Sequence, residues 1–426
     1  MKRTSIKESF HHFFEENELP TKETRKRLIN FQYRKKKERS TQKLLPFLIS
    51  LLFIVGAVSL FAILNKNDSN KTTLNSSEPT PNVQVHTDAV DENNSKKQLI
   101  DISHIKMMDE KTGWSHFNNM LLKTTDGGMT WEKPSPDLDK LNADEYFILT
   151  ENDVWILEYK YGDGIVTLHI TNDGGTTWKN SKTNILGSNP HLYFLNKQVG
   201  WMTTNGRSSA LNNEVFIYET KDGGMNWSFI DSNISLFDGI KGGLHFIDGR
   251  KGWMNITTPY TSNILYTNNA GVTWDLQQIH QEEQLYYSNE LSTFVNKQTG
   301  IFISHTQCND KPCAKFYLTT TGGDTWDLQS HISHSNAESL LLVNVIDEHS
   351  IYVTDQLQFF YYSTDFGATW ETIKLSELNI EGKIIQMDFL HANLGWAIIQ
   401  NGQHFNLYKI EQLNNWNPIS STLVTN

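Results

Sequence analysis

Carboxylates are the residues of this chain best suited to catalytic chemistry. Two carboxyl groups on one face of a site can serve as the acid and base pair of glycoside hydrolysis. Eight acidic residues lie in segments that would connect one repeat to the next: Asp137, Asp139, Asp144, Glu145, Glu282, Glu283, Glu290 and Glu338. Their spacing singles out no pair, and acidic loops are usually solvated. We therefore expect no catalytic residue, and we keep a glycosidase-like, carbohydrate-active enzyme as the alternative.

A second group of acids recurs inside a short phrase, such as TTDGGMTW, that ends in tryptophan. The aspartate can accept backbone N–H groups within a turn, a glycine can supply a positive φ, and the tryptophan can pack back onto the sheet. These roles are structural. The phrase contains Asp126, Asp173, Asp222 and Asp365, with Asn269 and Thr321 in their place in two copies, and ends at Trp131, Trp178, Trp227, Trp274, Trp326 and Trp370. Asn269 can still accept such a bond and Thr321 less well, so we expect two looser hairpins.

The elements that hold these residues follow from the repeat. With a decayed seventh copy ending at Trp416, the tryptophans are 47, 49, 47, 52, 44 and 46 residues apart. An earlier mark, usually Gly-Trp as at Gly200-Trp201, opens a short apolar strand, and all 12 tryptophans fall on one of the two marks. Each unit accommodates four short strands. Such a period predicts an all-β, seven-bladed β-propeller of four-stranded blades over residues 99–426. Full units lie at both ends, so the way in which the ring closes stays open.

The phrase resembles the Asp box, or bacterial neuraminidase repeat, with the pattern Ser/Thr-x-Asp-x-Gly-x-Thr-Trp. Period, Asp boxes and Gly-Trp strands together resemble the propellers of the photosystem II stability and assembly factor family, from about Leu99 to Ser420. The resemblance implies the fold and suggests a role in contacting other proteins. In photosynthetic members an arginine-rich surface is implicated in binding a membrane-protein client, but here only Arg207 and Arg250 follow residue 66. Two arginines also cannot supply the three that sialidases use to hold a substrate carboxylate.

The N-terminal part predicts a membrane anchor. Leu44 to Leu64 contains no charged residue and as a helix would span about 31 Å, close to the thickness of the bilayer hydrocarbon core. Residues 1–66 carry 14 Lys and Arg against 6 Asp and Glu, which leaves 23 of the chain's 37 basic and 42 of its 48 acidic residues for the remainder. The basic flank precedes the span, so we expect a cytoplasmic N-terminus. We predict a basic cytoplasmic tail (1–43), a transmembrane signal anchor (44–64), a flexible linker (65–98) and an extracytoplasmic propeller.

Few other residues suggest chemistry. The two cysteines, Cys308 and Cys313, flank a predicted hairpin turn, and a disulfide is plausible outside the cell. The histidines follow no metal-binding spacing, so we expect no metal and no cofactor. Exposed aromatic and arginine side chains favour interfaces. Candidate partner contacts, each of which could instead pack within a blade, are Tyr159, Tyr161, Arg207, Tyr260, Tyr286 and Tyr287.

These observations predict a non-catalytic binding or assembly module, tethered to the cell membrane, for a protein or a cell-envelope component. An acidic external part argues against nucleic acid as a ligand. Two other functions stay open: the carbohydrate-active enzyme, and a transmembrane sensor that signals through the basic tail.

Overall fold

The computed structural model describes residues 97–138, 141, 145–159, 164–209, 212–257, 262–279, 293–309, 311–333 and 341–424. The predicted tail, the predicted span Leu44–Leu64 and nearly all of the predicted linker lie outside these residues. Within them, no helix is both long and apolar enough to cross a bilayer. Ser95–Asn426 form one compact unit, and the first strand begins at Lys97.

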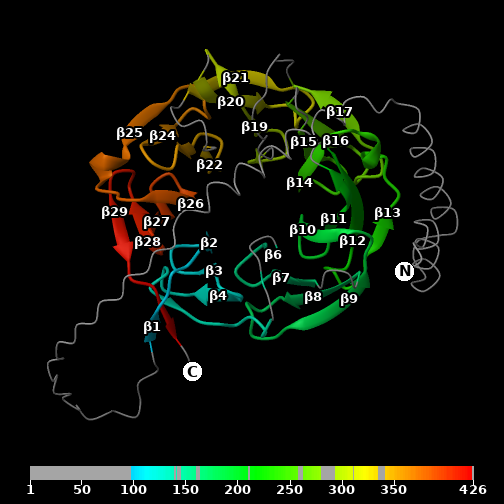
Figure 1. The fold of residues 1–426 in the computed structure, drawn as a ribbon, viewed down its shortest axis with the longest axis horizontal. Coiled ribbons are helices and arrows are strands. Elements are labelled where there is room, and N and C mark those ends of the chain that lie inside the picture. Colours follow the sequence, from blue (N-terminus) through cyan, green and yellow to red (C-terminus); the bar gives the residue numbers. More distant parts are fainter. Residues whose placement is uncertain are drawn as a thin grey trace, which may run out of the picture. The chain divides into compact units, whose positions relative to one another are not determined.

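Seven blades stand in a ring, in chain order (Figure 1), and six of them are four-stranded antiparallel sheets. Blade 1 comprises β2 (His104–Met107), β3 (Gly113–Phe117), β4 (Met120–Thr124) and β5 (Thr130–Trp131); blade 2 comprises β6 (Tyr146–Ile148), β7 (Val154–Tyr159), β8 (Ile165–Thr171) and β9 (Lys179–Asn184); blade 3 comprises β10 (Ser188–Phe194), β11 (Gly200–Ser209), β12 (Asn212–Thr220) and β13 (Ser228–Ile230). Blade 4 comprises β14 (Ile240–Phe246), β15 (Gly252–Thr257), β16 (Ser262–Thr267) and β17 (Asp275–Gln278), and blade 5 comprises β18 (Thr293–Phe294), β19 (Gly300–Cys308), β20 (Lys311–Thr319) and β21 (Asp327–Ser333). Blade 6 comprises β22 (Leu342–Val345), β23 (Ile351–Thr354), β24 (Phe359–Ser363) and β25 (Glu371–Lys374), and blade 7 comprises β26 (Lys383–His391), β27 (Leu394–Asn401), β28 (His404–Glu411) and β29 (Trp416–Ile419). The predicted seven-bladed propeller of four-stranded blades is confirmed, with β5 of blade 1 joined to β4 through the bridge between Lys123 and Glu132.

Two short 3-10 helices interrupt the strands: η1 (Ile234–Leu236) lies between blades 3 and 4, and η2 (Leu375–Leu378) between blades 6 and 7. Because the strands of a blade alternate in direction, its loops divide between two faces. The upper face, as we use the term, carries the hairpins between second and third strands and the connections between blades. The lower face carries the turns between first and second strands and the Asp-box hairpins.

The Gly-Trp mark builds the contact between neighbouring blades. The Phe194 ring stacks on Trp155 of the preceding blade at 3.9 Å between centroids, and it also lies over Gly200 of its own blade. A Cβ on Gly200 would come within 2.5 Å of that ring, so only glycine leaves the ring its place. Blade 4 repeats the arrangement with Phe246 stacked at 3.7 Å on Trp201. Gly200 and Gly252 thus make room for a phenylalanine ring of the first strand, and Trp155 and Trp201 contact the next blade.

The second-strand tryptophans also form hydrogen bonds between blades. The indole N–H of Trp155 donates to the carbonyl of Gly223 in the next Asp box at 2.8 Å. Trp201 donates in the same way to Ala270 at 3.3 Å, and Trp396 to Gly127 at 3.0 Å across the junction of blades 7 and 1.

The ring closes through a clasp outside blade 1. The C-terminal strand β30 (Thr422–Val424) pairs in parallel with β5, which sets Leu423 beside Trp131. The N-terminal strand β1 (Lys97–Leu99) pairs antiparallel with β30. On the inner side, Asp388 of blade 7 accepts the N–H of Met107 at 2.6 Å, and Lys106 donates to the same carboxylate at 3.0 Å. The strands β1 and β30, together with Asp388, therefore hold the first and last blades together.

Candidate binding surface

The Asp-box aspartates are occupied by their own hairpins. Asp126 Oδ1 accepts the N–H of Thr130 at 2.8 Å and the hydroxyl of Thr124 at 2.9 Å, and Oδ2 accepts the Thr130 hydroxyl at 2.5 Å. The corresponding side chains make the same set of bonds around Asp173, Asp222 and Asp365. These carboxylates are therefore engaged in holding turns on the lower face, as expected for a structural role.

The two substituted boxes keep the backbone bond. Asn269 Oδ1 accepts the N–H of Thr273 at 2.9 Å, and Thr321 Oγ1 accepts the N–H of Thr325 at 3.0 Å. The loosening predicted for these hairpins is not visible in the bond lengths, because the hydroxyl and amide oxygens still reach the same donor.

Hydrogen bonds lower the pKa of carboxyl groups in two of the lower-face turns. Bonds from the Thr177 hydroxyl and N–H lower the pKa of Asp173 from 3.8 to about 2. The N–H groups of Thr112 and Lys111 lower the pKa of Asp109, in the turn between β2 and β3. A general acid of a glycosidase needs a raised pKa instead. Among the described carboxyl groups whose pKa is clearly shifted, every shift is downward.

The Asp-box tryptophans divide into two groups. The indole N–H groups of Trp131, Trp227 and Trp274 donate to the carbonyl three residues earlier in their own box. Those of Trp178, Trp326 and Trp370 donate to the preceding blade, at Pro134, Gln277 and Ser330. All six therefore stabilise hairpins or blade contacts.

The upper face carries two long hairpins. In blade 3, β11 and β12 have ten and nine residues, and in blade 5, β19 and β20 have nine each. A disulfide joins Cys308 to Cys313 across the second hairpin. Arg207 is exposed on the first hairpin, where its N–H donates to the carboxylate of Glu214 at 3.3 Å.

A buried lysine fixes the blade 3 hairpin against blade 4. The Lys241 ammonium, with the residue 3% exposed, donates to the carbonyls of Asn213 at 2.7 Å and Gly239 at 2.9 Å. The Asn213 amide in turn bonds both the N–H and the carbonyl of Lys241, at 2.7 and 2.8 Å. Since a buried charge needs several partners, these bonds hold the end of the hairpin beside its turn in one position. The sequence analysis did not predict this network, because Lys241 and Asn213 are 28 positions apart and form no recognisable motif.

Only part of the predicted contact set lies in the described residues. Tyr159 ends β7 at the upper face, partly buried, with its hydroxyl 3.5 Å from the carbonyl of Gly187. Arg207 lies on the same face, on the next blade. Tyr161, Tyr260, Tyr286 and Tyr287 lie outside the described residues.

The loop acids form no recognisable catalytic pair in the described part of the chain. Asp137 is exposed and ion-paired with Lys133, and the hydrogen bond from Lys133 lowers its pKa. Glu145 is partly buried, and its carbonyl accepts the N–H of Leu157. The remaining acids lie outside the described residues: Asp139, Asp144, Glu282, Glu283, Glu290 and Glu338. Within the described ranges, no three His, Cys, Asp or Glu side chains gather where a metal ion could bind.

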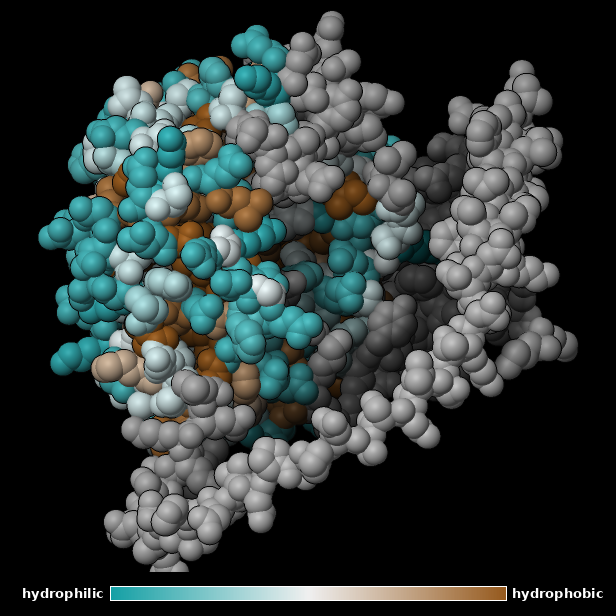
Figure 2. Space-filling model, turned by 60° about the vertical axis from the view of Figure 1, so that its left-hand side comes forward, coloured by the Kyte–Doolittle hydropathy of each residue, from teal (hydrophilic) through white to brown (hydrophobic). Residues whose placement is uncertain are grey.

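Hydrophilic side chains cover much of the described surface on the side shown in Figure 2. Figure 2 brings forward the side that lies on the left in Figure 1, and hydrophobic residues are scattered between hydrophilic ones there. Two exposed apolar residues flank the upper face near the blade 3 hairpin, Leu236 at 60% and Ile240 at 38% exposure.

Sequence-family models match two parts of the chain. Residues 84–243, which contain the first three blades, match the model described as photosynthesis system II assembly factor YCF48. Residues 361–372 match the BNR/Asp-box repeat. This chain is an Asp-box propeller that resembles the photosystem II assembly factors. No curated protein matches its sequence.

Solved structures share the fold of this assembly-factor-like propeller. YCF48 from Cyanidioschyzon merolae has 16% identity and a TM-score of 0.48, with 74% of this chain and 96% of that chain covered. A GH74 enzyme from Niastella koreensis has 12% identity and a TM-score of 0.51, with 77% and 54% covered. The GH74 xyloglucanase from Xanthomonas campestris has 10% identity and a TM-score of 0.51, with 77% and 55% covered. The chain spans about half the length of these two enzymes, and the likeness concerns the fold alone.

Proposed function

We propose that this propeller is a non-catalytic binding module for a protein or cell-envelope component, and that the segment Leu44–Leu64 tethers it to the membrane with the propeller outside the cell. One observation carries the binding part: the long upper-face hairpin of blade 3 is fixed close to its turn by the Lys241–Asn213 bonds while it exposes Arg207. A rigid hairpin loses little entropy when it binds, so its exposed side chains favour a specific interface.

The family resemblance supports the same function. The matching family model is described as an assembly factor, and such a factor acts by contacting other proteins. The lowered carboxylate pKa values on the lower face support the non-catalytic part, since they oppose general-acid chemistry.

Photo-cross-linking from defined positions tests the proposal. A photoreactive amino acid would replace Arg207 or Ser208 on the blade 3 hairpin of the full chain in intact cells. The matched control is Met225, which is 43% exposed on the lower face of the same blade. We expect one discrete cross-linked product from the hairpin positions and none from Met225. Absence of a product, or equal products from both faces, would contradict the proposed surface.

A separate assay tests whether the protein is a glycoside-cleaving enzyme. The purified chain would be incubated with a panel of fluorogenic glycosides. Turnover that disappears when two loop acids are replaced would overturn the non-catalytic part of the proposal.

A further inference from the structure

We propose that the outer strand of blade 2, β9 (Lys179–Asn184), is a docking edge for an extended acidic segment of a partner protein, which adds to the blade as a fifth strand. The inference rests on the proposed function in one respect, namely that the partner is a protein. It concerns the rim of the ring, whereas the surface proposed above lies on the upper face, so the two surfaces can be tested separately.

The first observation is the length and regularity of the β9 edge. In blades 2 to 7 the fourth strand lies at the rim of the ring and is the last described strand of its sheet (Figure 1), so its outward N–H and carbonyl groups can serve as a template for another strand. All six residues of β9 pair with β8 in an unbroken register. β21 has seven residues but its register with β20 shifts, β29 has four residues that include Pro418, and β13, β17 and β25 have three, four and four. β9 is therefore the longest regular edge among the described blades.

Blade 1 shows that an outer strand of this propeller accepts another strand. There β30 pairs in parallel with β5, and β1 pairs with β30, so the sheet continues outward beyond its fourth strand. Both added strands have three residues, fewer than the six that β9 presents. An extended peptide that adds to an edge in this way gains main-chain hydrogen bonds while the fold that presents the edge stays unchanged.

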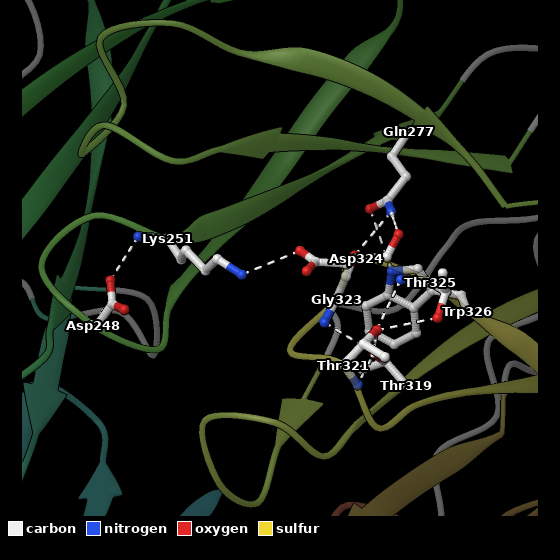
Figure 3. Close-up of polar contacts among 9 residues, drawn as sticks. All are labelled: Asp248, Lys251, Gln277, Thr319, Thr321, Gly323, Asp324, Thr325 and Trp326. Carbon is white, nitrogen blue, oxygen red and sulfur yellow. Dashed lines mark hydrogen bonds and ion pairs between the residues drawn. The ribbon is translucent and has the colours of Figure 1, made fainter.

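Two lysines give the β9 edge its charge. Lys179 and Lys182 are exposed, and their ammonium groups form no ion pair or hydrogen bond with the described residues. Lys251, at the contact of blades 4 and 5, differs because it reaches the carboxylate of Asp324 at 3.1 Å (Figure 3). After residue 66 the chain has 42 acidic and 23 basic residues, so two unpaired cations on one edge depart from the charge of this part of the chain.

The two lysines lie on opposite faces of the strand. Successive residues of a strand point to opposite sides, so Lys179 shares a face with Ser181, whose hydroxyl donates to the carbonyl of Gly224 in blade 3 at 2.8 Å. Lys182 lies on the other face, toward blade 1. A strand that pairs with β9 would meet one lysine on each of its faces, so acidic side chains three positions apart would match both.

The same charges decide against a second copy of this chain as the occupant. Pairing of two β9 strands would bring four lysines together, and lysine on an edge strand is one of the means by which natural sheets avoid such pairing. An acidic strand meets the opposite condition, because each lysine then faces a carboxylate. The lysines thus prevent self-association of the edge and select its partner.

A peptide with the inferred pattern tests the edge. The probe is a fluorescent peptide of Glu-Thr-Val repeats, in which threonine and valine favour an extended strand and a glutamate recurs at every third position. Fluorescence anisotropy measures its binding to the full chain in detergent. We expect the wild type to bind it and the double variant Lys179→Glu, Lys182→Glu to bind at least about tenfold more weakly, because both ion pairs become like-charge pairs. The matched control Lys374→Glu, Lys383→Glu changes the net charge equally at exposed lysines of blades 6 and 7 and should bind as the wild type does.

A second peptide separates strand pairing from charge alone. N-methylation of its main-chain nitrogens keeps every glutamate but removes the hydrogen-bond donors, and should weaken binding at least about tenfold. Hydrogen exchange of the β9 amides, followed by mass spectrometry, should slow when the unmodified peptide binds. Equal binding of both peptides would show that the lysines attract any anion, and absence of binding at millimolar peptide would equally overturn the inference. Self-association of the chain that the peptide reverses would identify a second copy as the occupant and would also overturn it.

The docking edge and the upper-face surface fail separately. If cross-linking from Arg207 gives no product while the peptide still binds at β9, the upper-face surface alone is contradicted. If Arg207 gives a discrete product while the peptide does not bind, or binds regardless of Lys179 and Lys182, the docking edge alone is contradicted.

Discussion

The fourth residue of each Asp-box hairpin carries a backbone constraint that repeats around the ring. It has a positive φ, and its N–H donates to the turn between the first and second strands of the same blade. Glycine stands there in four blades, but blades 4, 6 and 7 have Ala270, Phe366 and Gln412, with φ of 61°, 55° and 68°. Phe366 is buried in the core between blades 5 and 6, whereas Gln412 is exposed. Ala270 packs against the core between blades 3 and 4, so of the three only the Gln412 side chain gains no apolar packing.

Gln412→Gly should therefore stabilise the protein. Removing an exposed side chain from a left-handed conformation relieves about 1 kcal/mol, part of which the more flexible unfolded chain offsets. We expect a small rise in the urea concentration at the unfolding midpoint. Gly127→Ala, at φ 78° and with its Cβ 3.0 Å from the Glu110 carbonyl oxygen, should lower the free energy of unfolding by about 1–2 kcal/mol. A fall for Gln412→Gly as large as that for Gly127→Ala would show that strain is not the cause.

His245 should make stability depend on pH. It lies between the rings of Tyr193 and Phe294, at 5.4 and 5.7 Å, and desolvation lowers its pKa from 6.5 to about 4. Between pH 6.5 and 4 the His245 side chain binds a proton in the unfolded chain but not in the folded one. The free energy of unfolding is therefore at its full value above pH 6.5 and falls as the pH drops toward 4. The loss is on the order of 2–3 kcal/mol. In His245→Phe this part of the pH dependence should disappear from thermal unfolding curves recorded between pH 7 and 4, and an unchanged slope would refute the assignment.

At the scale of the element, the first two strands of a blade are matched to each other. In blades 3, 4, 5 and 7 the second strand has glycine, as at Gly200, and a first-strand phenylalanine lies over it, whereas Met107 lies over Gly113 in blade 1. Blade 2 has Val154 at this place, and its register partner is Ile148 instead of phenylalanine. A ring and a β-branched side chain cannot share this space, so the two positions vary together.

A double-mutant cycle measures this matching. Gly200→Val places its side chain in the Phe194 ring and should cost roughly 2–3 kcal/mol of stability through overpacking. The second change, Phe194→Ile, copies blade 2 and should recover part of that loss, although it costs stability in the native background because Trp155 loses its stacked ring. A favourable coupling energy of at least about 1 kcal/mol in urea unfolding supports the matching, and additive effects would contradict it.

The blades could be predicted from the sequence because each is built from local signals. Glycine, aspartate and tryptophan act within eight residues of one another, so the spacing of Trp131, Trp178 and their equivalents carries the period. The hydrogen bonds of Lys241 with Asn213 span 28 positions and depend on two blades being in place. The same holds for the hydrogen bond from Lys123 to Gly174, which spans 51 positions and joins blades 1 and 2. The partner-contact candidates stay a prediction, because most of them fall outside the described residues.

At the scale of the whole molecule, closure rests on two very short strands. β1 and β30 have three residues each, too few for a recognisable strand pattern, and their pairing joins the ends of the series. Leu423 of β30 is buried in the core between blades 7 and 1, beside Trp131 and Leu407. The clasp adds to the hydrogen bonds of Asp388, so blades 7 and 1 are held together on both the inner and the outer side of the ring.

Leu423→Ala should therefore destabilise the closed ring. Truncating a buried leucine removes its contacts and leaves a cavity, for a loss of roughly 2–3 kcal/mol in the free energy of unfolding. Val424→Ala on the same strand is the matched control, because Val424 is only partly buried and should lose less than about 1 kcal/mol. Urea unfolding of the full chain compares the two. Equal losses would mean that β30 contributes through its backbone pairing alone, and the clasp would then owe its stability to hydrogen bonds and not to the core between the first and last blades.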